Sequence, residues 1–503
     1  MLSPLPAARW NFDTAAHLLN RAGFGGAPAE IEALEKMGPE KAVAHLVDYE
    51  GTRDDTPNPS WAKPDPERIK KFQEARELRR KMQGATAEER QTLEQKAREI
   101  LREDMRDSRM HILELRGWWL DRMAKGPRPL QEKLTLFWHG HFATSAQKVK
   151  DAYLMWQQNE TFRRLASGSW NEMLAAVTQD PAMLLWLDQT QSRKEHPNEN
   201  YAREVMELFT LGEGHYTEKD ITEAARAFTG LVYDRIRQVS DYRPFIHDPG
   251  LKTVLGKTGR LTWQDVLDQI VAQPQAAAFI TAKLWRFFAS ENPSEELIAA
   301  LAETFRKADY HFKPVLRAMF QSEEFYAESI IRNQVKSPVQ WLVGSARMLE
   351  RDLPPVPVCS NFLANLGQDL FAPPNVKGWD GGLSWITTNN LLARYNQAEM
   401  LVYGKNQLQL NTERKGAKFM ETRFNRLHTS AKPIEVARIL SPEERASKSA
   451  LLPALEKRLL QGRLKPKQEA TLREYLDHRG TLDDHDILET IRLLMSTPEY
   501  QLT

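Results

Sequence analysis

The spacing of its apolar residues constrains what this chain can fold into more than any other feature. Between residues 108 and 350 nearly every apolar stretch repeats about every 3.6 residues, the period of one helix face. Alternating runs of β-branched residues are rare there, so we predict a mainly α fold. The expected helices span residues 14–24, 28–37, 43–47, 109–124, 129–139, 151–165, 170–177, 180–187, 199–211, 217–229, 262–272, 274–289, 294–307, 311–320 and 388–402.

The length of 503 residues allows about three domains of ordinary size, or one large domain with appendages. We predict a helical core domain over residues 1–402, a linker over 403–433 and a small helical subdomain over 434–503. Inside the core, residues 231–256 are the one stretch whose β-forming residues and flanking turns allow a small β-hairpin.

Residues 64–107 form a charged segment in which both signs alternate at i,i+3 and i,i+4 spacing. This pattern predicts one or two long solvated helices, protruding as an arm held by surface ion pairs. A partner-binding arm is the alternative.

Residues 353–390 differ from this charged segment, because they concentrate proline and glycine and interleave Phe371, Trp379 and Trp385. We predict a long ordered loop there, of the kind that often carries function.

The balance of charge and cysteine excludes several classes of function. Lys and Arg number 69 and Asp and Glu 68, so the net basic surface typical of nucleic-acid binders is missing and no nucleic-acid partner is expected. The single cysteine, Cys359, cannot form an internal disulfide or a thiolate cluster, and no His or basic residue lies beside it to activate it as a nucleophile. Any metal must therefore be held by nitrogen and oxygen ligands.

Membrane and export signals are also missing from the sequence. No apolar run reaches the roughly 18 residues of a spanning helix, so no membrane span is expected. The N-terminus has no basic region followed by an apolar stretch, so it is not a secretory signal. We expect a cytoplasmic protein as encoded.

The first polar cluster lies in residues 130–145, LQEKLTLFWHGHFATS. Glu132 and His139 share one face of a helix that should end near Trp138, and Gly140 should break the helix and present His141 from a turn. The two histidines are candidates for a divalent metal or for acid–base catalysis. Helix capping by one imidazole and packing of the other against Trp138 is the alternative.

The second polar cluster lies in residues 198–230, NENYAREVMELFTLGEGHYTEKDITEAARAFTG. Asn200, Arg203, Glu204 and Glu207 occupy one side of its first helix, and Thr217 with Asp220 should begin the next helix as a capping box. Two carboxylates one turn apart suit a divalent cation or a tuned acid–base pair. An ordinary polar face fits equally well. A metal site here would use His139, His141 and Glu204.

Two loop segments add candidate binding residues. His247 and Asp248 precede Pro249-Gly250, so a tight turn should display both side chains. In LFAPPNVKGWDGG, proline and glycine should hold a polar and aromatic set that could seat a sugar or other polar ligand. A lid of tryptophans over the core is the alternative. The set is Asn375, Lys377, Trp379 and, on the next helix, Arg394.

Common catalytic motifs are not found in the sequence. There is no GxGxxG after a strand, no GxxxxGK[ST], no HExxH and no GxSxG. Nicotinamide dehydrogenases, P-loop NTPases, zincins and α/β-hydrolases are thereby excluded.

The motifs HLLNRAGFG, LFWHGHFATS, FIHDPGLKTVLG, KSPVQWLVGSAR and LFAPPNVKGWDGG, with the second cluster between them, resemble the bacterial family called domain of unknown function 1800. The resemblance implies a large helical protein, often encoded beside a member of domain of unknown function 1501, which resembles alkaline phosphatases and sulfatases. It supplies no catalytic residues. Export together with such a signal-bearing partner is a further hypothesis.

Two classes of function follow. The first is a hydrolase-like enzyme, using a divalent metal or a His/carboxylate acid–base pair on a glycan or other polar substrate, with a non-haem redox site as a variant. Its pocket would gather the two polar clusters, with His247 and Asp248 at the rim. The second is a non-catalytic helical scaffold or chaperone for a partner enzyme, with residues 64–107 and 403–435 as contact surfaces.

Overall fold

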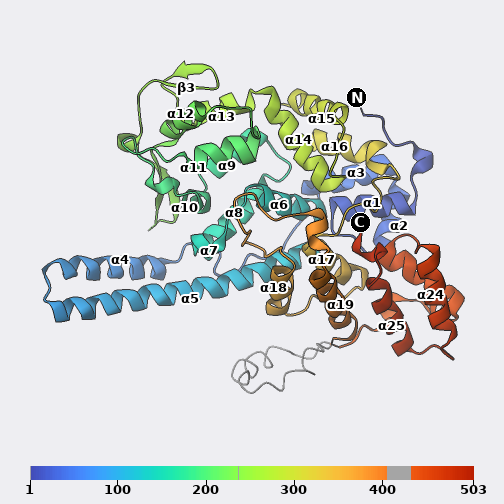
Figure 1. Ribbon diagram of the computed structural model, residues 1–503. Coiled ribbons are helices and arrows are strands. Elements are labelled where there is room, and N and C mark those ends of the chain that lie inside the picture. Colours follow the sequence, from blue (N-terminus) through green and yellow to red (C-terminus); the bar gives the residue numbers. More distant parts are fainter. Residues whose placement is uncertain (1, 236, 405–431) are drawn as a thin grey trace.

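The computed structural model describes residues 2–235, 237–404 and 432–503. The protein is mainly α, as predicted, and strand within the described residues is confined to two antiparallel pairs (Figure 1). No described helix is both long and apolar enough to cross a membrane.

The buried apolar side chains form two clusters. The first fills the upper part of the body in Figure 1, between the N-terminal helices and the central helices of the chain. Its helices are α1 (Phe12–Ala22), α2 (Pro28–Met37), α3 (Pro39–Val47), α9 (Trp170–Thr178), α11 (Glu199–Glu204), α12 (Glu218–Phe228), α13 (Trp263–Val271), α14 (Pro274–Phe288), α15 (Glu295–Lys307) and α16 (Phe312–Gln321).

The second cluster joins the root of the long helix α5 to the C-terminal helices. The hydroxyls of Ser345 and Tyr500 meet across it at 2.6 Å. Most of the predicted linker, residues 405–431, lies outside the described residues. The helices of this cluster are α5 (Ala87–Lys125), α17 (Pro338–Met348), α18 (Val356–Asn365), α19 (Thr388–Tyr403), α21 (Val436–Ile439), α23 (Lys448–Leu455), α24 (Pro466–Asp477) and α25 (Asp484–Met495), with α22 (Pro442–Arg445) beside them.

Three helices in the middle of the molecule contribute to both clusters. In α6 (Pro129–His141), for example, Trp138 belongs to the first cluster and Leu136 to the second. The others are α8 (Ala152–Arg164) and α10 (Pro181–Trp186), and the short α7 (Ala146–Val149) connects α6 to α8. The polar residues of α6 and α8 are therefore placed deep in the protein.

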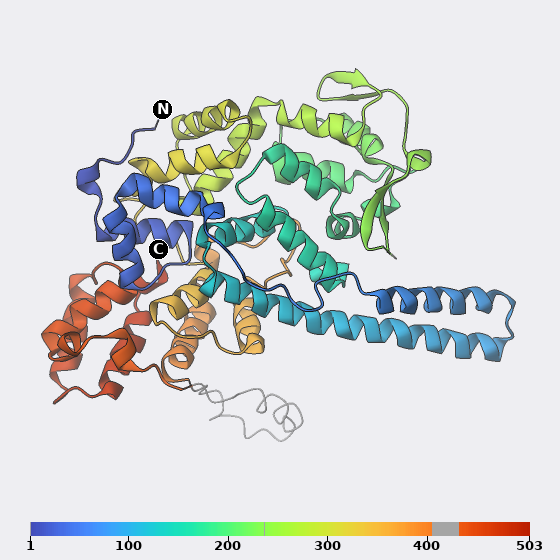
Figure 2. The same cartoon turned by 180° about the vertical axis from the view of Figure 1, so that it is seen from behind.

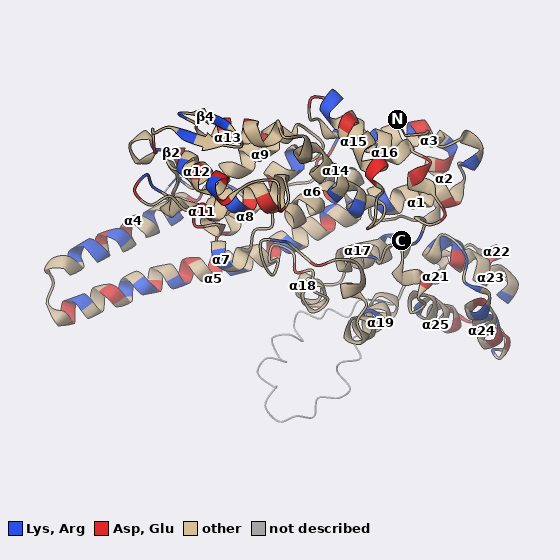
Figure 3. Ribbon diagram, turned by 45° about the horizontal axis from the view of Figure 1, so that its top comes forward, with Lys and Arg blue, Asp and Glu red and all other residues tan. Residues whose placement is uncertain are grey.

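The charged segment forms an arm of two antiparallel helices, α4 (Pro66–Lys81) and α5, that leaves the body (Figures 1 and 2). Both signs alternate along it (Figure 3). At its base the Arg68 guanidinium binds the carboxylates of Asp104 and Asp151 at 2.6 and 2.7 Å. Residues 109–124 are not a separate helix but lie inside the 39-residue α5, which contains no proline and runs through Gly117 without a break.

The prediction of one loop over residues 353–390 is only partly correct. Residues 356–365 form α18, with Pro357 in the first helical turn, where its missing N–H costs nothing. Between α18 and α19 the chain is irregular except for one 3₁₀ turn, Gly382–Trp385.

Residues 231–259 hold two short hairpins where we expected one. Strand β1 (Leu231–Asp234) pairs with β2 (Val239–Tyr242), and β3 (Lys252–Val254) pairs with β4 (Lys257–Gly259). The predicted capping box at Thr217 is confirmed, and the same Asp220 carboxylate also accepts from the backbone N–H of Leu255 at 2.7 Å. This contact fixes the second hairpin to the start of α12.

Candidate functional site

Glu132 lies at the centre of a buried ion-pair network between α5, α6 and α8. One carboxylate oxygen accepts from Arg122 Nε and Arg163 Nε at 2.8 and 2.7 Å. The other accepts from Arg163 Nη2 and the Trp119 indole at 3.0 and 2.9 Å. Four donors thus bind the carboxylate of a residue that is 1% exposed, which gives Glu132 a structural role.

His139 extends this network into an aromatic cage. Its Nε2 lies 3.0 Å from the amide nitrogen of Asn159, whose amide oxygen accepts from Arg163 at 2.7 Å, so the imidazole accepts. The ring packs at 4.7 Å from Trp119 and 5.1 Å from Phe371. Burial, with the charge of Arg163, lowers the pKa of His139 to about 3, and the ring is neutral near pH 7.

His141 belongs to a different part of the molecule. Helix α6 does not break at Gly140 but continues through His141, so the two imidazoles point about 200° apart around the axis. His141 Nε2 donates to the carbonyl of Phe209 at 3.0 Å, and its Nδ1 accepts from the Lys283 ammonium at 3.3 Å. Lys283 also donates to the carbonyl of Leu208 at 2.9 Å. Burial lowers the pKa of Lys283 to about 8 and that of His141 well below its usual value.

The predicted metal set of His139, His141 and Glu204 is not supported. Both nitrogens of His141 are engaged, and Nε2 of His139 is held by Asn159. Over residues 2–235, 237–404 and 432–503, no three His, Cys, Asp or Glu side chains are grouped so that they could hold a metal ion. Cys359 is buried, and burial raises the pKa of its thiol to about 12, which leaves it inert.

The carbonyls that His141 and Lys283 bind belong to a π-helical turn. Helix α11 continues directly into this turn, η5 (Val205–Thr210), where the N–H of Leu211 donates to the carbonyl of Met206, five residues back, at 2.8 Å. Such turns insert an extra residue into a helix and are frequent at functional sites. Its free carbonyls need donors, which α6 and α14 supply.

Glu204, the last residue of α11, and Glu207, within the π turn, both lie half-buried at the protein surface. Glu207 accepts from the hydroxyl of Tyr216 at 2.9 Å. Burial raises the pKa of Glu204, the charge of Glu207 raises it further, and the charges of Arg203 and Lys377 oppose the shift. One proton is therefore held more tightly at Glu204 than at an ordinary surface carboxyl.

The loop after α18 carries Lys377, whose charge acts on Glu204. Gly378 adopts a left-handed φ of +94°, and a Cβ built on it would lie 2.2 Å from the carbonyl oxygen of Gly140. A Cβ built on Gly140 would lie 3.7 Å from the ring of Trp379, whose indole donates to the carbonyl of Asp369 at 3.2 Å. Only glycine permits this close approach of loop to helix, which fixes the loop that carries Lys377 against α6.

Other predicted residues lie around or away from this site. Arg203 is half-exposed and forms a bidentate pair with Glu218 at 2.7 and 2.8 Å. Asn200 is exposed on the same helix. Asn375 is exposed, and its side chain accepts from the backbone N–H of Lys377 at 2.9 Å, so it shapes the loop.

His247 and Asp248 fix the hairpin region to the end of α12. Asp248 accepts from Arg226 Nε at 2.7 Å, and this bond lowers the pKa of the carboxyl. His247 Nδ1 lies 2.9 Å from the carbonyl of Thr229. These contacts give both residues a local structural role.

Arg394 is buried, not displayed beside the loop. Its guanidinium donates to the side chain of Gln501 at 3.1 Å and to the carbonyl of Lys336 at 2.8 Å. Burial lowers its pKa to about 10. Arg394 therefore joins α19 to the C-terminal segment.

The family model described as protein of unknown function (DUF1800) matches residues 17–502, nearly the whole chain. This protein belongs to that family. Comparison with curated proteins and with solved structures gives no match.

In this DUF1800 protein, parts of three family-like motifs meet at one place: the end of α6, the π turn η5 and the loop that carries Lys377. The site also includes Tyr216 and Lys283, which were not predicted from the sequence. Lys283 had a recognisable signal, a lone lysine in the apolar segment AAAFITAKLWRFF. Tyr216 had none beyond its position between a glycine turn and a helix cap.

Proposed function

We propose that this DUF1800 protein is a hydrolase-like enzyme whose acid–base pair is Glu204 and Glu207. The observation that carries the proposal is the placement of two half-buried carboxylates at the junction of α11 and its π turn, with the charge of Lys377 acting on Glu204 from the loop. Two carboxyl groups whose environments differ suit one proton donor and one proton acceptor. We take Glu204 as the donor because burial and its neighbour favour its protonated form.

The substrate that fits this chemistry is a glycan or a similar hydroxyl-rich molecule. Glu204 would protonate the leaving oxygen as its bond to carbon breaks, and Glu207 would accept a proton from the attacking water. Tyr216 orients Glu207 through their hydrogen bond. Lys377 and the exposed part of Trp379 would bind the substrate from the loop side, by charge and by stacking.

The experiment is a screen of soluble polysaccharides and peptidoglycan fragments for new reducing ends, with wild type, Glu204→Gln and Glu207→Gln. We expect each variant to lose about 10²-fold or more of the rate, as for loss of a general acid or base. Glu218→Gln is the matched control, because Glu218 is exposed and, among the described residues, its carboxylate pairs only with Arg203. No turnover of any substrate, or unchanged rates in both variants, contradicts the proposal.

A second candidate, the scaffold, is favoured by the α4/α5 arm. The arm projects from the body and is tied to it at its base, which suits contact with a partner such as the neighbouring domain of unknown function 1501 (Figure 2). Replacing residues 72–101 by a short Gly/Ser turn should abolish co-purification with that partner but preserve the helical body. Fractionating cells with and without the partner tests whether the pair is exported together.

A further inference from the structure

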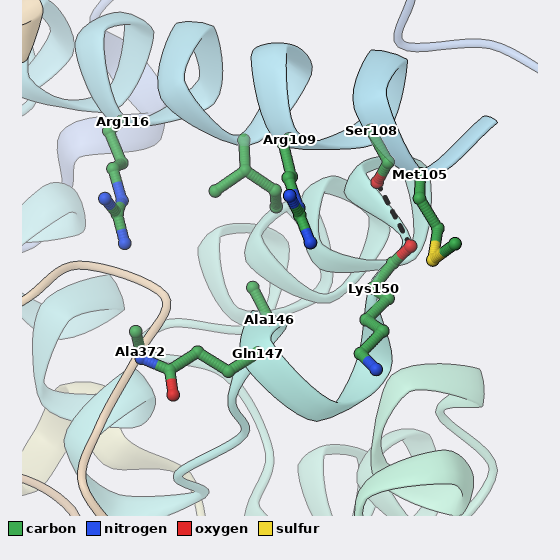
Figure 4. A pocket seen from close by; sticks show the side chains of 9 residues that line it. Met105, Ser108, Arg109, Arg116, Ala146, Gln147, Lys150 and Ala372 are labelled. Atoms are coloured by element: carbon green, nitrogen blue, oxygen red, sulfur yellow. Dashed lines mark hydrogen bonds between the residues drawn. The ribbon is translucent and has the colours of Figure 1, made fainter. Parts of the chain in front are cut away.

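A pocket of about 370 Å³ lies between α5, α7 and the loop that follows α18 (Figure 4). It is separate from the Glu204 site, and none of the candidate residues above lines it. Two hydrogen bonds hold its walls together: the N–H of Ala146 donates to the carbonyl of Phe371 at 2.8 Å, and the Ser108 hydroxyl donates to the carbonyl of Lys150 at 3.1 Å. The volume is within the range of small-molecule sites.

The floor of this pocket is apolar. Met105 and Ile112 face it from α5, and Ala146 and Ala372 line it from α7 and the loop. The two alanines leave room that a larger side chain would fill. An apolar body of a ligand would be removed from water here, which is the main source of affinity in such pockets.

The rim of the pocket is cationic. Arg109, Arg116 and Lys150 all contribute to its lining, and none of the nine lining residues is acidic. Figure 4 shows Arg109 and Arg116 descending from α5 toward the loop and α7. Arg116 is held in place by Asp369 at 2.7 Å and by the carbonyl of Leu370 at 3.0 Å.

The other two cations of the rim have no such partner. Neither the Arg109 guanidinium nor the Lys150 ammonium makes a hydrogen bond or ion pair with any described residue. Lys150 also adopts a left-handed φ of +56°, an unfavourable conformation for lysine that Ser108 helps to hold. Two free cations above an apolar floor are complementary to a molecule with an anionic head and an apolar body.

We propose that this pocket binds a small organic anion, with a carboxylate or phosphate head between Arg109, Arg116 and Lys150 and an apolar body on the floor. Arginine can hold either head through two parallel N–H···O bonds, and the Lys150 ammonium adds charge. The proposal does not depend on the acid–base function at Glu204.

Calorimetric titration of the full chain with octanoate and with octyl phosphate at low ionic strength tests this site. We expect saturable binding of one molecule per chain for at least one of the two, and the preferred head group identifies the natural class. Octanol and octylamine share the apolar body but not the negative charge, and they should not bind measurably.

Charge reversal locates the binding. Arg109→Glu and Lys150→Glu should each lower the affinity at least about tenfold, because a favourable charge contact becomes a repulsion at short range. Arg90→Glu is the matched control on the same helix, about 28 Å from Arg109 at 1.5 Å per residue, and should leave the affinity unchanged.

Four results would overturn the proposal. These are no saturable binding of either anion, equal binding of octanol, affinities unchanged in both charge reversals, and binding only to anionic phospholipid vesicles without binding of free octyl phosphate. The last would make this face a membrane-contact surface.

Discussion

Replacing Glu132 by glutamine should destabilise the protein strongly without reaching the acid–base pair. The carboxylate is 1% exposed and accepts four hydrogen bonds from Arg122, Arg163 and Trp119. The amide would keep one acceptor but turn a donor toward the guanidinium groups. The substitution also leaves two buried positive charges short of their shared counter-ion.

The size of the stability loss depends on which hydrogen-bond and ion-pair partners Arg122 and Arg163 keep. Breaking a buried ion pair by removing one partner costs about 3–5 kcal/mol. Arg122 keeps Asp54, and Arg163 keeps Glu160 and Asn159, so part of the charge remains compensated. We therefore expect the lower end, about 3 kcal/mol, for Glu132→Gln.

Urea unfolding followed by far-ultraviolet circular dichroism measures this loss. The control is Glu218→Gln, the same chemical change in a side chain that is 77% exposed, for which we expect less than about 1 kcal/mol. Burial alone would raise the pKa of Glu132, but Arg163 and Arg122 outweigh it and lower the pKa. Its contribution should therefore be lost as the pH falls through this lowered value. A loss below about 1 kcal/mol at pH 7 in Glu132→Gln would refute the reasoning.

Three further perturbations test other parts of the account. Gly378→Ala should free the loop from α6, because its Cβ would lie 2.2 Å from the Gly140 carbonyl oxygen. Hydrogen exchange of the backbone amides of residues 375–380 should then accelerate. Exchange as slow as in wild type would contradict this prediction. Lys133 is buried and its pKa is lowered to about 7, so between pH 7 and 9 the unfolded chain binds one proton more than the folded protein at this residue. The free energy of unfolding should therefore rise from pH 7 to 9. Lys133→Met should flatten that rise, and an unchanged slope would contradict the prediction. Asp248→Asn weakens the pair with Arg226 and should cost about 1 kcal/mol in urea unfolding at pH 7, whereas no loss would make the pair dispensable.

The sequence predicted most of the helices because their signals are local. Apolar period, N-caps and prolines in first turns define α2 as Pro28–Met37, the predicted range, and the Thr217 capping box starts α12 as expected. Predictions from the sequence were wrong where a tertiary contact overrides the local signal. Gly140 was interpreted as a helix end, but the helix continues and Trp379 packs over the glycine.

The candidate site was predicted only in pieces. Glu204, Glu207 and Lys377 were each selected from separate motifs, but nothing local indicates that residues about 170 positions apart in the chain meet. The same limit explains Glu132 and His139, whose polar types suggested catalysis. Their partners Arg122, Arg163 and Asn159 lie on other helices and convert them into a buried structural network.

The most direct test of the central claim is a ¹³C NMR titration of the Glu204 carboxyl, assigned by the signal that Glu204→Gln removes. We expect a pKa above that of an ordinary glutamate, lowered when Glu207→Gln removes the neighbouring charge and raised further in Lys377→Gln. An ordinary pKa that responds to neither substitution would show that Glu204, Glu207 and Lys377 do not form one electrostatic unit, and would contradict the proposed acid–base pair.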